Sequence, residues 1–148
     1  LGIAIFFGPE LIEWGVRSLR QKRPEQKIKV MRSIVREIID LYGVDLVVVK
    51  KLHRSRSSKL LEKLVQALDT LAKDKKVRFL QYPLAEIETW FSNERINKHQ
   101  LAEHIVDQYP FLCHDLKREQ SNKNTYYLRM FEAVALGVVC QSRLERDN

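Results

Sequence analysis

Short apolar runs open the chain and are separated by a turn signal. The run from Leu1 to Phe7 ends at Gly8-Pro9, and a second run with β-prone residues follows from Leu11 to Leu19. Glycine next to proline is typical of a tight turn, and two β-prone runs around such a turn predict a hairpin. We therefore expect the chain to begin with two antiparallel strands.

Helix-spaced and strand-length segments alternate after the hairpin. Apolar residues recur every three or four positions after Pro24, and Gly43 follows the last of them, which predicts a long helix with a glycine C-cap. The run from Val44 to Val49 is continuously apolar apart from one Asp, so it predicts a central parallel strand that is buried on both faces. A second amphipathic helix from Leu60 and a strand over Val77–Tyr82 are expected next.

The rest of the chain is predicted to be largely helical. A short helix is expected at Ile87–Phe91, and Asn97 is expected to cap a helix that ends before Pro110. Residues 113–125 are predicted to be polar and irregular, and a last helix is expected over residues 126–143. Alternating helices and strands after a hairpin predict a single α/β domain over residues 1–148, with a mixed sheet flanked by helices.

Composition limits the class of protein. The chain has 148 residues and only two cysteines, which argues against a disulfide scaffold or a thiolate zinc cage. Its apolar runs are shorter than a membrane-spanning helix requires, and a signal-peptide pattern is missing. We therefore expect a reduced, cytoplasmic setting without a membrane.

Positive charge is concentrated in two clusters. Lys and Arg total 26 against 19 Asp and Glu, a net charge of +7. One cluster lies between Arg17 and Arg36, the other between Lys50 and Lys63, and each contains little acid. Such clusters favour a phosphate-backbone partner, while solvated helix faces remain the alternative explanation.

Familiar catalytic motifs are missing from the sequence. The five glycines form neither a phosphate-binding loop nor a dinucleotide fingerprint, and no Gly-x-Ser-x-Gly elbow occurs. His99 and Glu103 are one helical turn apart, but His104 points about 100° away from Glu103 on a helix, so surface polar residues are favoured over a metal site.

One acid lies in an apolar context on the last helix. Glu132 is surrounded by Met130, Phe131, Ala133 and Val134, where a carboxylate costs free energy unless it is paired. Arg129, one turn earlier, is a candidate partner in an ordinary ion pair. A role as a metal ligand is the alternative.

The order of these segments resembles the RuvC-type Holliday junction resolvases of the ribonuclease-H-like superfamily. The resemblance covers nearly the whole chain. It is carried by Gly2-Ile3-Ala4-Ile5, Leu11 to Val16, VDLVVVKK, Gln81-Tyr82-Pro83 with Lys98-x-Gln100-Leu101, and Phe131 to Leu136. It implies a ribonuclease-H-like fold and DNA as a partner, either branched or duplex, with a homodimer as the assembly.

The catalytic positions implied by this resemblance are mostly not acidic. The family's first strand and its metal-binding Asp would precede Leu1, or the Asp would fall on Ala4. The acid at the end of the fourth strand falls on Lys50. Of the paired acids on the last helix, Glu132 matches one and Arg129 stands at the other. We expect the first strand to be missing and the active site to be degenerate.

The resemblance therefore predicts DNA binding, with Glu132 as the candidate catalytic residue and Mg²⁺ as the cofactor only if the chain is active. The predicted nucleic-acid-binding residues are Lys50, Lys51, Arg54, Arg56, Lys59, Lys98 and Arg129. Two alternatives remain. One is an active magnesium-dependent nuclease whose N-terminal strand supplies an Asp, and the other is a protein-interaction or dimerisation module.

Overall fold

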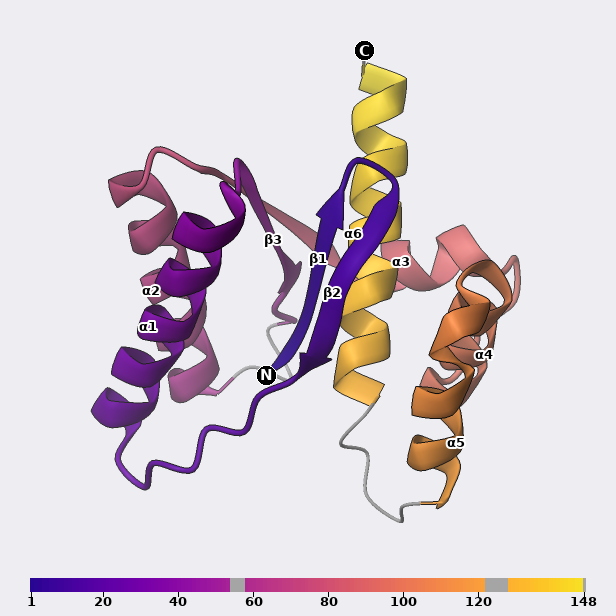
Figure 1. The fold of residues 1–148 in the computed structure, drawn as a ribbon, viewed down its shortest axis with the longest axis horizontal. Coiled ribbons are helices and arrows are strands. Elements are labelled where there is room, and N and C mark those ends of the chain that lie inside the picture. The colour runs from indigo at the N-terminus through magenta and orange to yellow at the C-terminus, as the bar shows by residue number, and fades with distance from the viewer. Residues whose placement is uncertain (54–57, 122–127, 148) are drawn as a thin grey trace. The chain divides into compact units, whose positions relative to one another are not determined.

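A computed structural model describes residues 1–53, 58–121 and 128–147, and the chain divides into two compact units (Figure 1). Unit 1 comprises Leu1–Ser18 and Leu84–Asn148, and unit 2 comprises Leu19–Pro83. Within the described residues, no helix is both long enough and apolar enough to cross a bilayer.

The predicted hairpin is confirmed in unit 1. Strand β1 (Gly2–Phe7) pairs antiparallel with β2 (Glu10–Val16), and Gly8 in the turn between them has a positive φ of 55°. That φ lies in the left-handed region, which glycine adopts without the penalty a Cβ would bring. The Gly8-Pro9 pair therefore predicted the turn correctly.

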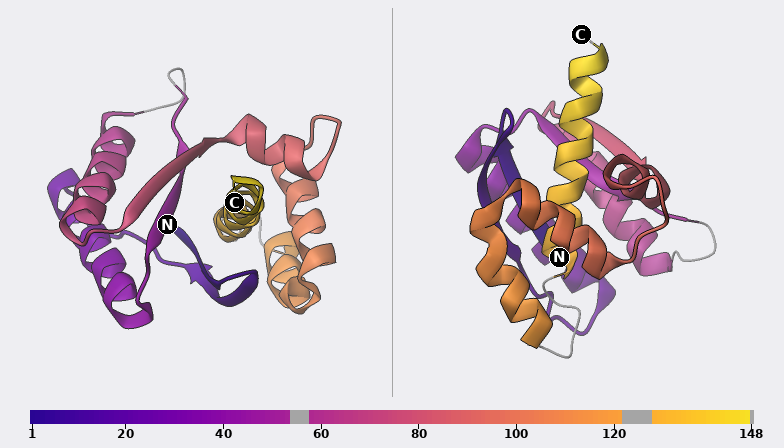
Figure 2. Two further views of the ribbon diagram at one scale, coloured as in Figure 1. Left: turned by 90° about the horizontal axis from the view of Figure 1, so that it is seen from above. Right: turned by 90° about the vertical axis from the view of Figure 1, so that its right-hand side faces the viewer.

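Helix α6 (Leu128–Asp147) lies at the centre of unit 1. The hairpin packs on one side of it, and helices α3 (Leu84–Phe91) and α4 (Lys98–Gln108) pack on the other (Figure 2). The short 3₁₀ helix η1 (Pro110–Leu112) then connects α4 to α5 (Cys113–Ser121). The hairpin, α3 and α4 are therefore arranged around a single helix, and η1 and α5 pack against α4.

The core of unit 1 explains why α6 is central. Val134 and Ala135 on α6 are completely buried, as are Ile105 of α4 and Leu112 of η1. The hairpin approaches α6 closely because Gly137 has no side chain, and a Cβ there would collide with the ring of Phe6. Close packing of this kind supplies most of the stability of short helices, whose intrinsic propensity is marginal.

The prediction of an irregular segment over residues 113–125 is wrong for its first part. Residues Cys113–Ser121 form α5, with Asp115 in the first turn and Arg118 in the last. These charges complement the helix dipole, and Lys117 and Arg118 are good helix formers. The polarity of the segment concealed the helix, because a mostly exposed helix has no long apolar repeat.

Unit 2 has the predicted order of helix, strand, helix and strand. Helix α1 (Pro24–Tyr42) ends at Gly43, whose φ is 62°, and α2 (Lys59–Asp74) connects β3 (Leu46–Lys51) to β4 (Arg78–Pro83). The two strands pair in parallel, as predicted for VDLVVV. Met31 of α1 packs in a core with Leu71 and Ala72 of α2, each of them 1% exposed.

One detail of the predicted sheet needs correction. Residues 46–50 of β3 are half-buried rather than fully buried, and among the described residues β3 pairs only with β4. The described strands form an antiparallel pair, β1–β2, in unit 1 and a parallel pair, β3–β4, in unit 2. A continuous apolar run predicts burial on both faces only when neighbouring strands and helices cover it.

Candidate nucleic-acid interface

The predicted binding residues are distributed over both units. Lys50, Lys51 and Lys59 belong to unit 2, whereas Lys98, Arg129 and Glu132 belong to unit 1. Arg54 and Arg56 lie outside the described residues. Each unit therefore presents its own set of candidate residues.

Both helices of unit 2 run in the same direction (Figure 1). The Lys75 ammonium, just after α2, lies 2.9 Å from Oδ1 of Asp40 near the end of α1, so the carboxyl ends of the two helices are together. Because β3, α2 and β4 form a parallel crossover, the carboxyl ends of the strands lie with the amino end of α2. One end of unit 2 therefore brings together two helix N-termini and two strand C-termini.

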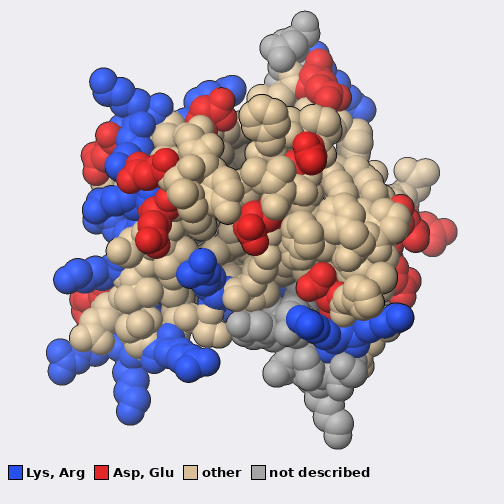
Figure 3. Space-filling view, viewed as in Figure 1, with Lys and Arg blue, Asp and Glu red and all other residues tan. Residues whose placement is uncertain are grey.

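Positive charge gathers at this end of unit 2, which we call the basic end. From Lys22 onward, the described residues at this end include nine Lys and Arg residues and two acids, Glu25 and Glu62. The nine are Lys22, Arg23, Lys27, Lys29, Arg32, Lys50, Lys51, Lys59 and Lys63. In Figure 3, the part of unit 2 where α1 begins shows mainly Lys and Arg side chains on its surface.

The opposite end of unit 2 is electrically balanced. Among its described residues, five basic side chains accompany five acidic ones. They are Arg36, Lys73, Lys75, Lys76 and Arg78, with Glu37, Asp40, Asp45, Asp69 and Asp74. Some of them form ion pairs, such as Lys73 with Asp69 at 3.5 Å. The excess charge of unit 2 is therefore a property of one end and not of its whole surface.

Local folding does not account for the charge at the basic end. Cations near a helix N-terminus are unfavourable because the first turn already carries partial positive charge. Lys59 is the first residue of α2, after the N-cap Ser58, whose hydroxyl accepts a hydrogen bond from the Leu61 amide at 3.2 Å. Arg23 is the N-cap of α1 and makes no side-chain capping hydrogen bond. An anionic partner would turn this unfavourable arrangement into a favourable one.

The residues Lys50 and Lys51 occupy the carboxyl end of β3. In the parallel register Lys50 lies opposite Tyr82 and Lys51 opposite Pro83, both at the carboxyl end of β4. Lys50 is half-buried and Lys51 is exposed, as is Lys59. The structure therefore brings three of the predicted binding residues to the basic end.

In unit 1 the structure brings together Lys98 and Glu132. The Lys98 ammonium lies 3.2 Å from Oε1 of Glu132, and the side chains are 56% and 17% exposed. Lys98 was predicted to bind phosphate and Arg129 was the predicted partner of Glu132, so the ion pair formed by Lys98 was missed. Arg129 lies one turn before Glu132 and is exposed.

The start of α4 holds Lys98 in place. Asn97 caps the helix as predicted, and its Oδ1 accepts a hydrogen bond from the Gln100 amide at 2.8 Å. The Gln100 side chain accepts one in return from the Asn97 amide at 2.9 Å, which completes a capping box. Leu101 and Ala102, which follow, are 2% and 0% exposed. Lys98 thus projects from a fixed helix end.

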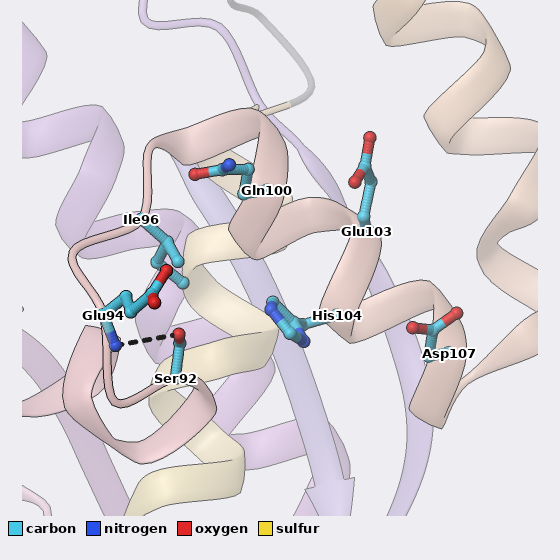
Figure 4. A pocket seen from close by; sticks show the side chains of 7 residues that line it. All are labelled: Ser92, Glu94, Ile96, Gln100, Glu103, His104 and Asp107. Carbon is cyan, nitrogen blue, oxygen red and sulfur yellow. Dashed lines mark hydrogen bonds between the residues drawn. The ribbon is translucent and has the colours of Figure 1, made fainter.

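A pocket near the predicted His99–His104 segment contains acids that do not converge (Figure 4). Ser92, Glu94, Ile96, Gln100, Glu103, His104 and Asp107 line it. The Glu103 and His104 side chains point in different directions, and the His104 ring lies 6.3 Å from that of Phe91. In the part of the chain that the structure describes, no three His, Cys, Asp or Glu residues are placed to hold a metal ion.

The cations of α1 were recognised in sequence as a charge cluster but were not assigned to the site. Their place at the basic end follows from the direction of α1 relative to α2, which the Lys75–Asp40 contact fixes. The parallel β3–α2–β4 unit was predicted, so the direction of α2 could have been inferred. The direction of α1 could have been inferred in the same way, because only three residues separate it from β3 and so short a connection reverses the chain.

Comparison with known proteins identifies the fold. No protein-family model matches the sequence, and no curated protein matches it. Among solved structures, Thermus thermophilus RuvC has a TM-score of 0.67 at 13% identity, over 97% of this chain and 88% of that one. T. thermophilus RuvC in complex with a Holliday junction substrate has a TM-score of 0.65 at 14% identity, over 97% of this chain and 87% of that one. The chain therefore has a RuvC-like, ribonuclease-H-like fold.

Proposed function

We propose that this chain binds nucleic acid, specifically duplex or branched DNA, through the basic end of unit 2, and that it does not cleave the DNA. The observation that carries the proposal is the accumulation of nine basic residues where two helices begin and β3 ends. Lys and Arg at helix N-termini form charge-assisted hydrogen bonds with phosphate oxygens.

The comparison supports DNA as the nucleic acid. One of the similar structures is a RuvC protein bound to a Holliday junction substrate, and its fold is shared over 97% of this chain. At 14% sequence identity, the shared fold does not establish the ligand of this chain. The ligand has to be argued from this chain's own residues. A branched substrate, a homodimeric assembly and a single domain over residues 1–148 stay predictions.

We propose that the chain does not cleave DNA because basic residues occupy two positions where the resemblance implies acids. Lys50 and Arg129 stand where the resemblance implies carboxylates, and Glu132 is paired with Lys98 at 3.2 Å. Two-metal phosphate chemistry requires several carboxylate oxygens that converge on the ions. Cations at these positions, one in each unit, favour retention of a phosphate backbone over its hydrolysis.

A charge-reversal experiment tests the binding face. Lys51→Glu with Lys59→Glu changes two exposed residues of the basic end, and Arg36→Glu with Lys73→Glu makes the same change in net charge at the balanced end. We expect fluorescence anisotropy with labelled duplex and four-way junction DNA to show a loss of roughly tenfold or more for the first variant only. Tighter binding of the junction than of the duplex would support branched DNA as the ligand.

Other outcomes would support the alternatives. Equal losses in the two variants would mean that net charge, and not the basic end, determines binding. DNA binding that is absent, or indifferent to salt, would favour a protein-interaction module. Junction cleavage that requires Mg²⁺ and disappears in Glu132→Gln would establish an active nuclease and contradict the proposal.

A further inference from the structure

A row of aromatic rings lies beside the hairpin of unit 1. The Trp14 ring of β2 lies 5.0 Å from the Phe111 ring of η1, centroid to centroid. The Tyr109 ring lies 5.9 Å from that of Phe111 and 6.4 Å from that of Phe6 on β1. Ring pairs at about 4.5–7 Å stabilise one another, so these four residues, which we call the aromatic row, support each other's positions.

The middle of the aromatic row is exposed although its backbone is anchored. Phe111 is 49% exposed, whereas the next residue, Leu112, is completely buried. Pro110 restricts the backbone at the start of η1. Because Leu112 takes the inward position, Phe111 is held outward, with the rings of Trp14 and Tyr109 near it. An exposed aromatic side chain that is held in this way is typical of the residues that anchor protein–protein interfaces.

The charge around the aromatic row is negative. Its rings come from residues 6–14 and 107–115, and these two segments contain four acids and no Lys or Arg. The acids are Glu10, Glu13, Asp107 and Asp115. In Figure 3, the part of unit 1 around the hairpin shows acidic side chains on an otherwise uncharged surface. Unit 1 as a whole has twelve Asp and Glu against nine Lys and Arg. This surface therefore repels phosphate and attracts cations.

Arginine is the side chain that matches both the rings and the acids. Its planar guanidinium stacks on aromatic faces and also forms two parallel hydrogen bonds with a carboxylate. Unit 1 contains both kinds of contact elsewhere: Arg146 lies 5.5 Å from the centroid of the Trp90 ring, and Arg143 forms an ion pair with Glu86. Nucleic-acid bases also stack on aromatic rings, but the acids around the row would repel their phosphates.

We propose that the aromatic row docks an arginine-containing, amphipathic segment of a partner protein. One guanidinium stacks on Phe111 or Trp14 and pairs with a neighbouring carboxylate, and apolar side chains beside it pack against the rings. This inference concerns unit 1 and a protein partner, whereas the proposed function concerns DNA and the basic end of unit 2. Peptide binding is measured without DNA, so the failure of either can be recognised separately.

A short fluorescent peptide in which arginine alternates with leucine tests the docking surface on the full chain. We expect anisotropy to show that affinity falls roughly tenfold or more in Phe111→Ala, and likewise in Glu10→Gln with Glu13→Gln. Glu94→Gln with Glu145→Gln makes the same change in net charge at two exposed residues outside the two segments, and is expected to bind as the wild type does. A peptide with lysine in place of arginine is expected to bind more weakly, because an ammonium lacks the planar, bidentate geometry.

Several results would overturn the proposal. Absence of peptide binding by the wild type, full affinity in Phe111→Ala, or equal losses in the two pairs of charge variants would show that the aromatic row is not the docking surface. If Phe111→Ala does not fold, Phe111→Leu replaces it, because leucine keeps an apolar side chain and removes the ring.

Two further measurements separate the other occupants. Weaker binding of single-stranded DNA by Phe111→Ala, with peptide binding intact, would assign the row to base stacking. A dimer that becomes a monomer in Phe111→Ala by analytical ultracentrifugation would assign it to an interface between copies of this chain. We expect neither DNA affinity nor the oligomeric state to change.

Discussion

The Lys98 ammonium and the Glu132 carboxylate are 3.2 Å apart and connect the first residue of α4 to the second turn of α6. The two residues are 34 positions apart in sequence; Lys98 precedes the buried Leu101 and Ala102 on α4, and Glu132 follows the buried Phe131 on α6. Their contact joins the amino-terminal parts of two helices of unit 1. It also places a positive charge beside the one acid of α6 that the family resemblance marks as catalytic.

A double-mutant cycle should detect this contact as a coupling in stability. We expect Lys98→Gln and Glu132→Gln each to lower the free energy of unfolding by about 1 kcal/mol, with a coupling of roughly 0.5–1 kcal/mol. The estimate is modest because Lys98 is 56% exposed. Denaturant unfolding of the four proteins measures it. Strict additivity would mean that the pair contributes nothing to stability.

The salt dependence of DNA binding should report individual phosphate contacts at the basic end. Lys59→Gln is expected to reduce the slope of log K against log salt by about one, because one fewer counterion is released from DNA. Lys73→Gln, at the balanced end beside Asp69, is expected to leave the slope unchanged. Anisotropy titrations over a range of salt concentrations measure both. A change in intercept without a change in slope would contradict a phosphate contact at Lys59.

Local sequence signals predicted most elements because each was determined by residues close in the chain. The Gly8-Pro9 turn, the Gly43 C-cap and the Asn97 N-cap were all confirmed. These features depend on one or two residues whose backbone preferences or side-chain acceptors are strong. Helix α5 was missed because its exposed polar residues give no periodic signal, although some of them, such as Lys117 and Arg118, are good helix formers.

The candidate site was harder to predict because it depends on contacts between elements distant in sequence. The resemblance identified Glu132 and Lys98 separately as site residues. Nothing within four residues of Glu132 indicates that Lys98 lies beside it. The intrahelical candidate, Arg129, was the natural prediction from helix spacing.

Removal of the α4 cap should destabilise unit 1. Asn97→Ala leaves the Gln100 amide without its acceptor, so we expect a loss of about 1 kcal/mol in the free energy of unfolding. Asn97→Asp retains an acceptor oxygen and is expected to stay close to wild type. Thermal or denaturant unfolding compares them. Equal losses in the two variants would mean that the amide NH₂ group of Asn97, rather than its acceptor oxygen, supports the helix.

A methyl group at Gly137 should disturb the packing of the hairpin on α6. The Cβ of Gly137→Ala would collide with the Phe6 ring, so we expect a loss of about 1–3 kcal/mol although alanine is the better helix former. The double variant Gly137→Ala with Phe6→Leu removes the collision and should recover part of the loss. An increase in stability for Gly137→Ala alone would show that the hairpin does not pack on α6 as described.

Titration of Tyr109 should make stability fall at alkaline pH. Burial raises the pKa of Tyr109, only partly offset by a hydrogen bond with Gln108, and its hydroxyl donates to the Pro9 carbonyl at 3.5 Å. The unfolded chain loses this proton near pH 10, whereas the folded chain keeps it to higher pH. The folded state then binds more protons, so its stability declines as pH rises through that interval and levels off above the folded pKa.

We expect the free energy of unfolding of wild type to fall more steeply above about pH 10 than that of Tyr109→Phe, and the two to run parallel at lower pH. Urea unfolding across this range measures the difference, and parallel curves throughout would show that Tyr109 titrates alike in both states.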